Sequence, residues 1–167
     1  QEPQLGTGHA LQQAAPLLDD DGTTLVLSGD VPLIESDALE RLVAAAGPRR
    51  LALLTVELAD PRGYGRVVHA TGGGAIEAIV EEKDASDDQR SIDEINSGIY
   101  AFEGAFLADA LGRITNDNSK GEYYLTDVVG IAVGDGRPVG AHQVDDALQT
   151  EGANDRAQLA TLAKALN

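Results

Sequence analysis

Hydrophobic residues recur along this 167-residue chain with two spacings, one typical of helices and one typical of buried strands. Apolar stripes spaced three and four residues apart predict helices, the first of them with Thr7 as its N-cap. Continuous aliphatic runs predict strands, and the run at 23–28 is typical of a strand buried on both faces. Helices are predicted over residues 7–18, 36–46, 104–111, 125–133 and 155–165, and strands over residues 23–28, 51–56, 66–69, 75–80, 96–102 and 138–144.

The order of these elements predicts the fold class. A strand, a helix and a strand follow one another between residues 23 and 56, which is the order of a β–α–β unit. After residue 65 two short strands flank Gly72-Gly73-Gly74, and they predict a hairpin. We therefore expect an α/β fold over residues 1–167, with a mixed, mostly parallel sheet and helices on both faces.

Composition excludes several classes of function. The formal net charge of -16, from 28 acidic and 12 basic residues, would repel a polyanion, so we expect no nucleic-acid partner. The chain has no cysteine, which excludes disulfides and thiolate chemistry. No apolar run could span a bilayer and no signal-peptide pattern is present, so we expect a cytoplasmic protein with no membrane partner. A nucleotide substrate is still compatible with this charge, because a carboxylate-bound divalent cation neutralises phosphates locally.

Asp30 is the strongest single candidate for chemistry. It follows Ser28 and Gly29 at the carboxyl end of a predicted parallel strand, where open α/β sheets bind ligands. Mg²⁺ prefers hard oxygen ligands, so Asp30 and the side-chain oxygen of Asn154 would make a minimal site. The alternative is that Asp30 caps a turn and Asn154 caps the last helix.

Other candidates are weaker when each is taken singly. Exposed N–H groups at Gly6 and Thr7, at a helix start, could bind a planar base or an anion. Two adjacent tyrosines between Glu122 and Thr126 stand out in a chain with 4% aromatic residues. The three histidines show no spacing that suggests a catalytic triad or a zinc site, and we expect them to be structural or exposed.

Several short motifs nonetheless occur in a fixed order, and together they resemble the pyrophosphorylase domain of the bacterial N-acetylglucosamine-1-phosphate uridyltransferases. The resemblance covers essentially the whole chain and implies a Rossmann-like nucleotide-diphospho-sugar transferase fold. The motifs are Gln4-Leu5-Gly6-Thr7-Gly8-His9-Ala10, Ser28-Gly29-Asp30-Val31-Pro32-Leu33, Gly63-Tyr64-Gly65-Arg66, Ile79-Val80-Glu81-Glu82-Lys83-Asp84, Glu94-Ile95-Asn96-Ser97-Gly98, Gly121-Glu122-Tyr123-Tyr124-Leu125-Thr126-Asp127 and Gly152-Ala153-Asn154-Asp155-Arg156.

The resemblance implies a reaction and a set of site residues. UTP and N-acetylglucosamine 1-phosphate would give UDP-N-acetylglucosamine and pyrophosphate by Mg²⁺-assisted in-line attack. Asp30 and Asn154 would be the catalytic metal ligands, and Ser28 and Gly29 would lie in the same substrate site. The remaining assignments group by ligand: the uracil base would be bound by Gln1, Gly6 and Thr7, and the amino-sugar phosphate by Gly65, Glu81, Asn96, Tyr124 and Thr126.

The sequence also departs from this family. Members open with a Gly-rich loop and a lysine that this chain lacks, and Lys120 stands where they usually have glutamine. We therefore expect a pyrophosphorylase domain without its N-terminal βα units, inactive alone, whose parent adds a β-helix acetyltransferase domain and forms homotrimers. Two alternatives stay open: a related sugar-nucleotide pyrophosphorylase, or a non-catalytic fragment that binds a sugar phosphate.

Overall fold

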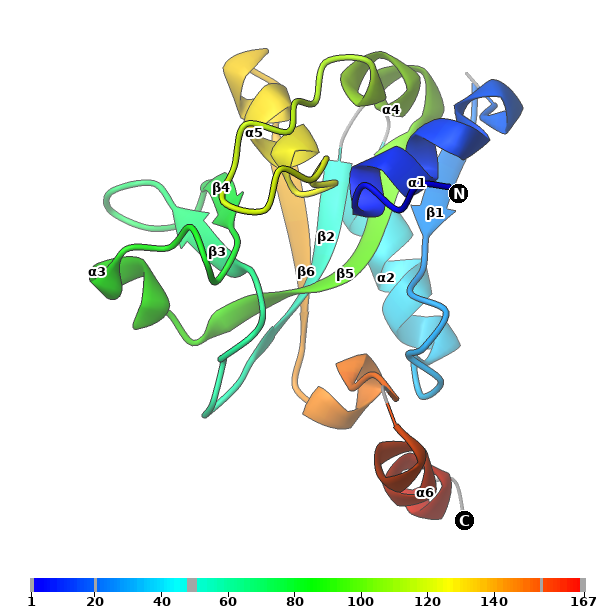
Figure 1. The fold of residues 1–167 in the computed structure, drawn as a ribbon, viewed down its shortest axis with the longest axis vertical. Helices are drawn as coiled ribbons and strands as arrows, with labels where there is room; N and C mark the ends of the chain where they lie inside the picture. The colour runs from blue at the N-terminus through cyan, green and yellow to red at the C-terminus, as the bar shows by residue number, and fades with distance from the viewer. Residues whose placement is uncertain (1, 20, 48–50, 154, 166–167) are drawn as a thin grey trace.

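A computed structural model describes residues 2–19, 21–47, 51–153 and 155–165 of the chain. The helices and strands lie in one layered unit around a central sheet (Figure 1). The helical segments are α1 (Thr7–Ala14), η1 (Ala15–Leu17), α2 (Ser36–Ala46), α3 (Asp87–Arg90), α4 (Gly104–Leu111), α5 (Asp127–Gly134), η2 (Ala147–Thr150) and α6 (Arg156–Ala165), and the strands are β1 (Thr23–Val26), β2 (Leu51–Glu57), β3 (Arg66–His69), β4 (Ile76–Val80), β5 (Glu94–Glu103) and β6 (Val139–Val144).

The long strand β5 organises the sheet. The strands follow the order β4-β3-β5-β2-β6, and β1 also pairs with β5. The start of β5 bonds β3, where Ile95 faces Arg66, and its end bonds β1, where Tyr100 faces Val26. The strand β5 thus joins the hairpin of β3 and β4 to β1 and β2.

The predicted α/β class and the helices on both faces of a mixed sheet are confirmed, but the expected majority of parallel strand pairs is wrong. Among the described pairings only β2 with β6 is parallel. The cause is the position of β5, which runs antiparallel to both β1 and β2 and lies between them. The two strands of the predicted β–α–β unit do run in the same direction, but they are not neighbours.

Alternation along the strands divides the core into two layers. In β2, Leu51 and Leu53 pack toward α4 and α5, whereas Ala52 and Leu54 pack toward Leu42 of α2. Successive side chains of a strand point to opposite faces, so a fully apolar strand requires a cover on each side. The aromatic part of the core, which includes Tyr100, Phe102 and Phe106, lies on the face of α4 and α5.

Three predicted details of the N-terminal region are wrong. The α-helix ends at Ala14 and is followed by η1, because Pro16 has no amide hydrogen to continue the ladder. Gly6 is the N-cap, and Thr7 is the first helical residue. The predicted strand at 23–28 is shorter and not buried on both faces: Leu25 is 39% exposed, because β1 lies at the border of the described sheet with β5 as its partner.

The C-terminal helix α6 lies at one end of the molecule, beyond η2 (Figure 1). Its Leu162 is fully buried, whereas Leu159 on the same helix is 53% exposed. Within the described residues, no helix combines the length and the apolar character needed to cross a bilayer.

Candidate functional site

Residues that lie far apart in the sequence meet in one cavity of about 400 Å³, here called cavity A. Gly6 and Thr7 lie at the start of α1, Glu81 directly follows β4, and Tyr124 lies in the loop before α5. The complete lining is Gln4, Gly6, Thr7, Ala10, Glu81, Lys120, Glu122 and Tyr124. Candidate base-binding and sugar-binding residues, separated by more than seventy positions, therefore share one cavity.

The α1 end of cavity A is held by contacts with the loop before α5. The Thr7 hydroxyl accepts the backbone N–H of Leu125 at 3.1 Å, which ties the first turn of α1 to that loop. Gly6 has a φ of 105°, and a Cβ there would lie 2.6 Å from the carbonyl oxygen of Tyr123. Glycine is required here because an L side chain would meet both backbone strain and a collision with fixed main chain.

The opposite wall of cavity A is built around Glu81. The Thr126 hydroxyl donates a hydrogen bond to Glu81 Oε1 at 3.0 Å, and Thr126 is only 5% exposed. Asp127 lies next to this pair, and burial, followed by the charges of Glu81 and Asp84, raises its pKa. One oxygen of Glu81 is thus held by the protein in a region where negative charge accumulates.

Gly65 and Asn96 lie behind this wall and line neither cavity A nor the second cavity described below. The Asn96 N–H donates to the Gly65 carbonyl at 2.9 Å, which joins the two residues across the sheet. The Asn96 side chain donates to the Tyr100 hydroxyl at 2.7 Å and accepts the Gly98 N–H at 3.2 Å. Both residues are buried, and the Gly65 carbonyl and both ends of the Asn96 side-chain amide make hydrogen bonds within the protein.

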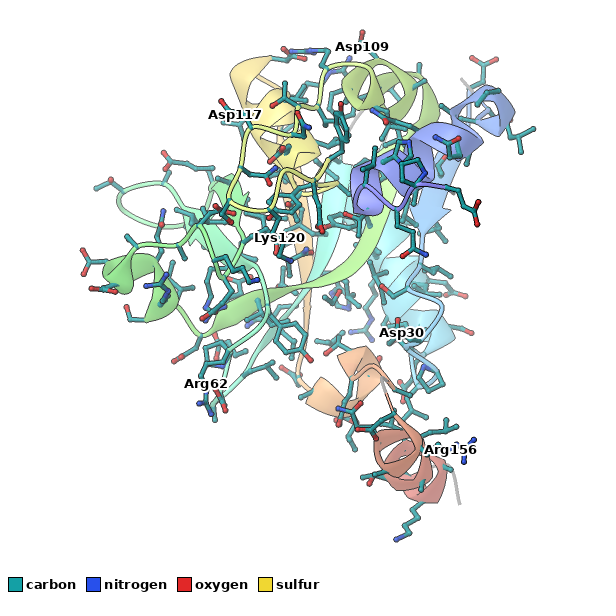
Figure 2. All side chains as sticks on the ribbon, viewed as in Figure 1. Asp30, Arg62, Asp109, Asp117, Lys120 and Arg156 are labelled. Atoms are coloured by element: carbon teal, nitrogen blue, oxygen red, sulfur yellow. The ribbon has the colours of Figure 1, made fainter. Side chains whose placement is uncertain are left out.

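A second cavity, about 390 Å³ in volume and here called cavity B, contains Asp30. Its lining is Ser28, Asp30, Val31, Arg62, Gly63, Tyr64, Ser97, Thr150 and Gly152. In Figure 2 Lys120 of cavity A is labelled near the middle of the molecule, and Asp30 lies further down, toward the segment that leads to α6. Six of the predicted residues thus line two separate cavities: Gly6, Thr7, Glu81 and Tyr124 line cavity A, and Ser28 and Asp30 line cavity B.

The surroundings of Asp30 suit a cation. Its carboxylate is exposed, and within the described residues nothing hydrogen-bonds it. The Ala153 N–H donates to the Asp30 carbonyl at 2.8 Å, which brings the segment before Asn154 alongside. A Cβ at Gly152 would lie 3.2 Å from Asp30 Oδ2, so glycine keeps space beside the carboxylate.

Two of the predicted residues, Gln1 and Asn154, lie outside the described residues. The described part of the chain holds no group of three or more Asp, Glu or His side chains that could bind a metal ion. Gly29 follows Ser28 in an open position, where a Cβ would meet no atom within 4 Å. The predicted pairing of Asp30 with Asn154 stays a prediction.

Sequence reasoning did not assign some residues that the fold brings to these cavities. Lys120 lines cavity A, where its ammonium group lies 5.9 Å from the centre of the Tyr124 ring. Arg62 lines cavity B, and its guanidinium is bound to Asp60, whose pKa it lowers to about 2. Lys120 had a signal in the sequence as a departure from the family motif, whereas Arg62 had none.

Comparison with known proteins gives consistent results. Residues 1–148 match the model of a family described as nucleotidyl transferase. The chain is 60% identical over 165 residues to the bifunctional protein GlmU of Paracidovorax citrulli. The match covers 99% of this chain and 35% of that protein. It is 59% identical over 162 residues to bifunctional GlmU of Azotobacter vinelandii, covering 97% of this chain and 35% of the relative. The chain thus spans about a third of the length of these curated relatives.

A solved structure of UDP-glucose pyrophosphorylase complexed with UDP-glucose is similar in fold. The TM-score is 0.74 and the sequence identity is 16%, with 99% of this chain and 63% of that chain covered. At this identity the likeness establishes the fold alone, and it agrees with the Rossmann-like α/β architecture expected from the motifs.

Proposed function

The chain belongs to the nucleotidyl transferase family, and we propose that the protein transfers a uridylyl group from UTP to N-acetylglucosamine 1-phosphate. The products would be UDP-N-acetylglucosamine and pyrophosphate. The observation that carries this proposal is the meeting of Gly6 and Thr7 with Glu81 and Tyr124 on cavity A. The uridine base and the amino sugar are joined through a diphosphate in the product, so the residues that bind the two ends are expected within reach of one ligand.

In this proposal, different residues of cavity A bind the uracil and the sugar. Gly6 and Thr7 line the side of cavity A that would take the uracil, and Gln1 would add to that contact. Glu81 accepts hydrogen bonds from sugar hydroxyls through the oxygen that Thr126 does not use. Tyr124 lines the sugar side of the cavity.

Gly65 and Asn96 complete the sugar side in this proposal. The Asn96 amide would offer the sugar the hydrogen and the lone pair that its protein partners leave, and the backbone near Gly65 would lie against the sugar phosphate. Both lie behind Glu81 and are joined by a hydrogen bond between their main chains.

We further propose that Asp30 and Asn154 hold Mg²⁺, with Ser28 and Gly29 beside it. The exposed carboxylate, free of protein partners among the described residues, and the space kept by Gly152 fit such an ion. The ion would neutralise phosphate charge. The protein's own contribution is then to hold the sugar phosphate so that its oxygen attacks the α-phosphorus of UTP in line and pyrophosphate leaves.

The proposal is tested by pyrophosphate release from the intact protein that contains this chain. UTP, N-acetylglucosamine 1-phosphate and Mg²⁺ should give turnover that chelation by EDTA abolishes and added Mg²⁺ restores. Glucose 1-phosphate in place of the amino-sugar phosphate, and dTTP in place of UTP, should each lower kcat/KM by at least about tenfold, since one lost polar contact is worth about 1–2 kcal/mol. Faster turnover with either substitute would instead identify a related sugar-nucleotide pyrophosphorylase.

A second measurement concerns the 167-residue chain by itself. We predict that it binds UDP-N-acetylglucosamine weakly and releases no measurable pyrophosphate, because the family's triphosphate-binding loop is not among these residues. Isothermal titration with the sugar nucleotide separates binding from turnover. Turnover by this chain alone would overturn the prediction and show that its own residues suffice.

A further inference from the structure

The side-chain amide of Asn96 has one defined orientation. The Gly98 N–H lies 3.2 Å from one end of the amide, and because a backbone N–H can only donate, that end is the oxygen Oδ1. The other end, Nδ2, therefore faces the Tyr100 hydroxyl at 2.7 Å and donates to it. One amide hydrogen and one oxygen lone pair are left over for another partner.

We propose that Tyr100 is a positioning residue for the sugar phosphate, because its hydroxyl holds the Asn96 amide in the orientation that meets the ligand. The inference rests on the proposed function, in which Asn96 binds polar groups of the sugar. Tyr100 itself does not line cavity A or cavity B. It acts through Asn96, four residues earlier on β5.

The Tyr100 ring is fixed without help from its hydroxyl. The residue is 2% exposed, and its ring stacks on Phe102 with centroids 5.3 Å apart and an angle of 26° between the planes. On the sheet it lies between Val26 of β1 and Leu53 of β2. A phenylalanine would make the same apolar contacts, so the hydroxyl serves the amide and not the packing.

The hydroxyl stays protonated at any physiological pH. Burial, and to a smaller extent the charge of Glu81, raises the pKa of Tyr100, while the bond from Asn96 acts in the opposite direction. A neutral phenol accepts the amide hydrogen and keeps its own proton for donation.

The experiment is a double-mutant cycle in the intact protein with Tyr100→Phe, Asn96→Ala and the combination of both. Y100F should raise KM for N-acetylglucosamine 1-phosphate about three- to tenfold and leave KM for UTP within twofold, since one neutral hydrogen bond is lost. N96A should raise the same KM by at least tenfold. In the N96A background, Y100F should have no further effect on KM, because the amide that it positions is gone.

The measured KM values separate the role of Tyr100 from that of Asn96. An unchanged KM in Y100F, or an equal effect of Y100F with and without Asn96, overturns the positioning role and leaves the proposed function intact. An unchanged KM in N96A overturns the sugar-binding role of Asn96, and the inference falls with it.

NMR of the Asn96 side chain tests the role of Tyr100 even if the protein does not catalyse the proposed reaction. In ¹⁵N-asparagine-labelled protein, the Asn96 side-chain NH₂ signals should shift and exchange faster with solvent in Y100F than in the wild type, while Tm changes by no more than a few degrees. Unchanged signals would overturn the inference whatever the substrate is.

Discussion

Cavity A and cavity B differ in how their functional groups are held. In cavity A the Glu81 carboxylate accepts the Thr126 hydroxyl, and the Thr7 hydroxyl accepts the Leu125 N–H. In cavity B the Asp30 carboxylate is exposed and, among the described residues, makes no hydrogen bond. Bonded groups are preorganised and recognise a ligand by shape and polarity, whereas a free carboxylate acts through charge. We expect variants of cavity A to weaken binding of the sugar, and variants of cavity B to slow the chemical step.

The largest effect should come from Asp30→Asn in the intact protein. The change preserves shape but removes the charge that would hold Mg²⁺, so kcat/KM should fall at least about a hundredfold and higher Mg²⁺ should restore part of it. Because Asp30 is exposed, Tm should change by less than about 2 °C. Asp37→Asn is the matched control, since that exposed carboxylate pairs with Arg41 on α2, away from both cavities. More than a third of wild-type activity in D30N would refute the assignment.

Gly98→Ala should disturb cavity B and the Asn96 amide, because Gly98 contacts both. Its N–H binds Asn96, and a Cβ there would lie 3.1 Å from the Ser28 hydroxyl of cavity B. With a φ of 81°, alanine is also strained, and the two effects together should destabilise the fold by about 1–3 kcal/mol. For a domain of this size that is a fall in Tm of about 3–10 °C, measured by thermal unfolding.

Gly136 provides the matched control for the contact with Ser28. Its φ is 68°, but a Cβ there would meet no atom within 4 Å, so Gly136→Ala carries the backbone strain alone. G98A should therefore lower Tm more than G136A, and Ser28→Ala should recover part of the difference. Equal losses in the two glycine variants would show that the contact with Ser28 contributes nothing.

The sequence predicted the local elements better than the contacts between them. The apolar runs of β2 and the helical stripe of α2 were predicted correctly, because alternation and periodicity report burial directly. The insertion of β5 between β1 and β2 was not, because strand order depends on pairing across dozens of residues. Where fewer neighbours cover a strand, as at Leu25, an apolar run alone overstated burial.

At the candidate site, too, the sequence identified residues but not the contacts between them. The motifs identified Glu81 and Thr126 as candidates, but the bond between them joins residues 45 positions apart and has no trace in local spacing. Thr7 was predicted as an N-cap from its position before a helical stripe, and its hydroxyl instead accepts a backbone N–H from Leu125. Local rules identify the residue types that can bond, and the tertiary fold decides which partner each one finds.

Thr126→Val should have an effect confined to cavity A. Valine has nearly the same shape but cannot donate to Glu81, so KM for N-acetylglucosamine 1-phosphate should rise about three- to tenfold. The kcat and the Mg²⁺ requirement should stay within twofold of the wild type, in contrast to D30N. Thr161→Val, which removes an exposed hydroxyl from α6, is the control and should leave all three constants unchanged. A raised Mg²⁺ requirement in T126V would mean that the two cavities do not work separately.

The smallest effect should be a pH-dependent one at Asp127, beside cavity A. Burial first, then the charges of Glu81 and Asp84, raises the pKa of this half-buried carboxyl. A raised pKa means that the folded state favours the protonated form. Its ionisation therefore lowers stability as pH rises from about 4, the ordinary value, through the raised pKa. Asp127→Asn mimics the protonated form, so Tm should match the wild type near pH 4 and exceed it at pH 7.5.

The expected gain at pH 7.5 is only about 1–3 °C, because the carboxyl is partly solvated and lies in the first turn of α5, where the helix dipole favours negative charge. Asp135→Asn gives the opposite sign, since the Arg113 guanidinium lowers the pKa of Asp135 and its ionised form stabilises the fold at neutral pH. D135N should therefore lose Tm at pH 7.5 and approach the wild type in acid. If D127N instead lost Tm at pH 7.5, the favourable interaction of the Asp127 carboxylate with the helix dipole would outweigh its repulsion by Glu81 and Asp84. The ionised form of Asp127 would then stabilise the fold at neutral pH.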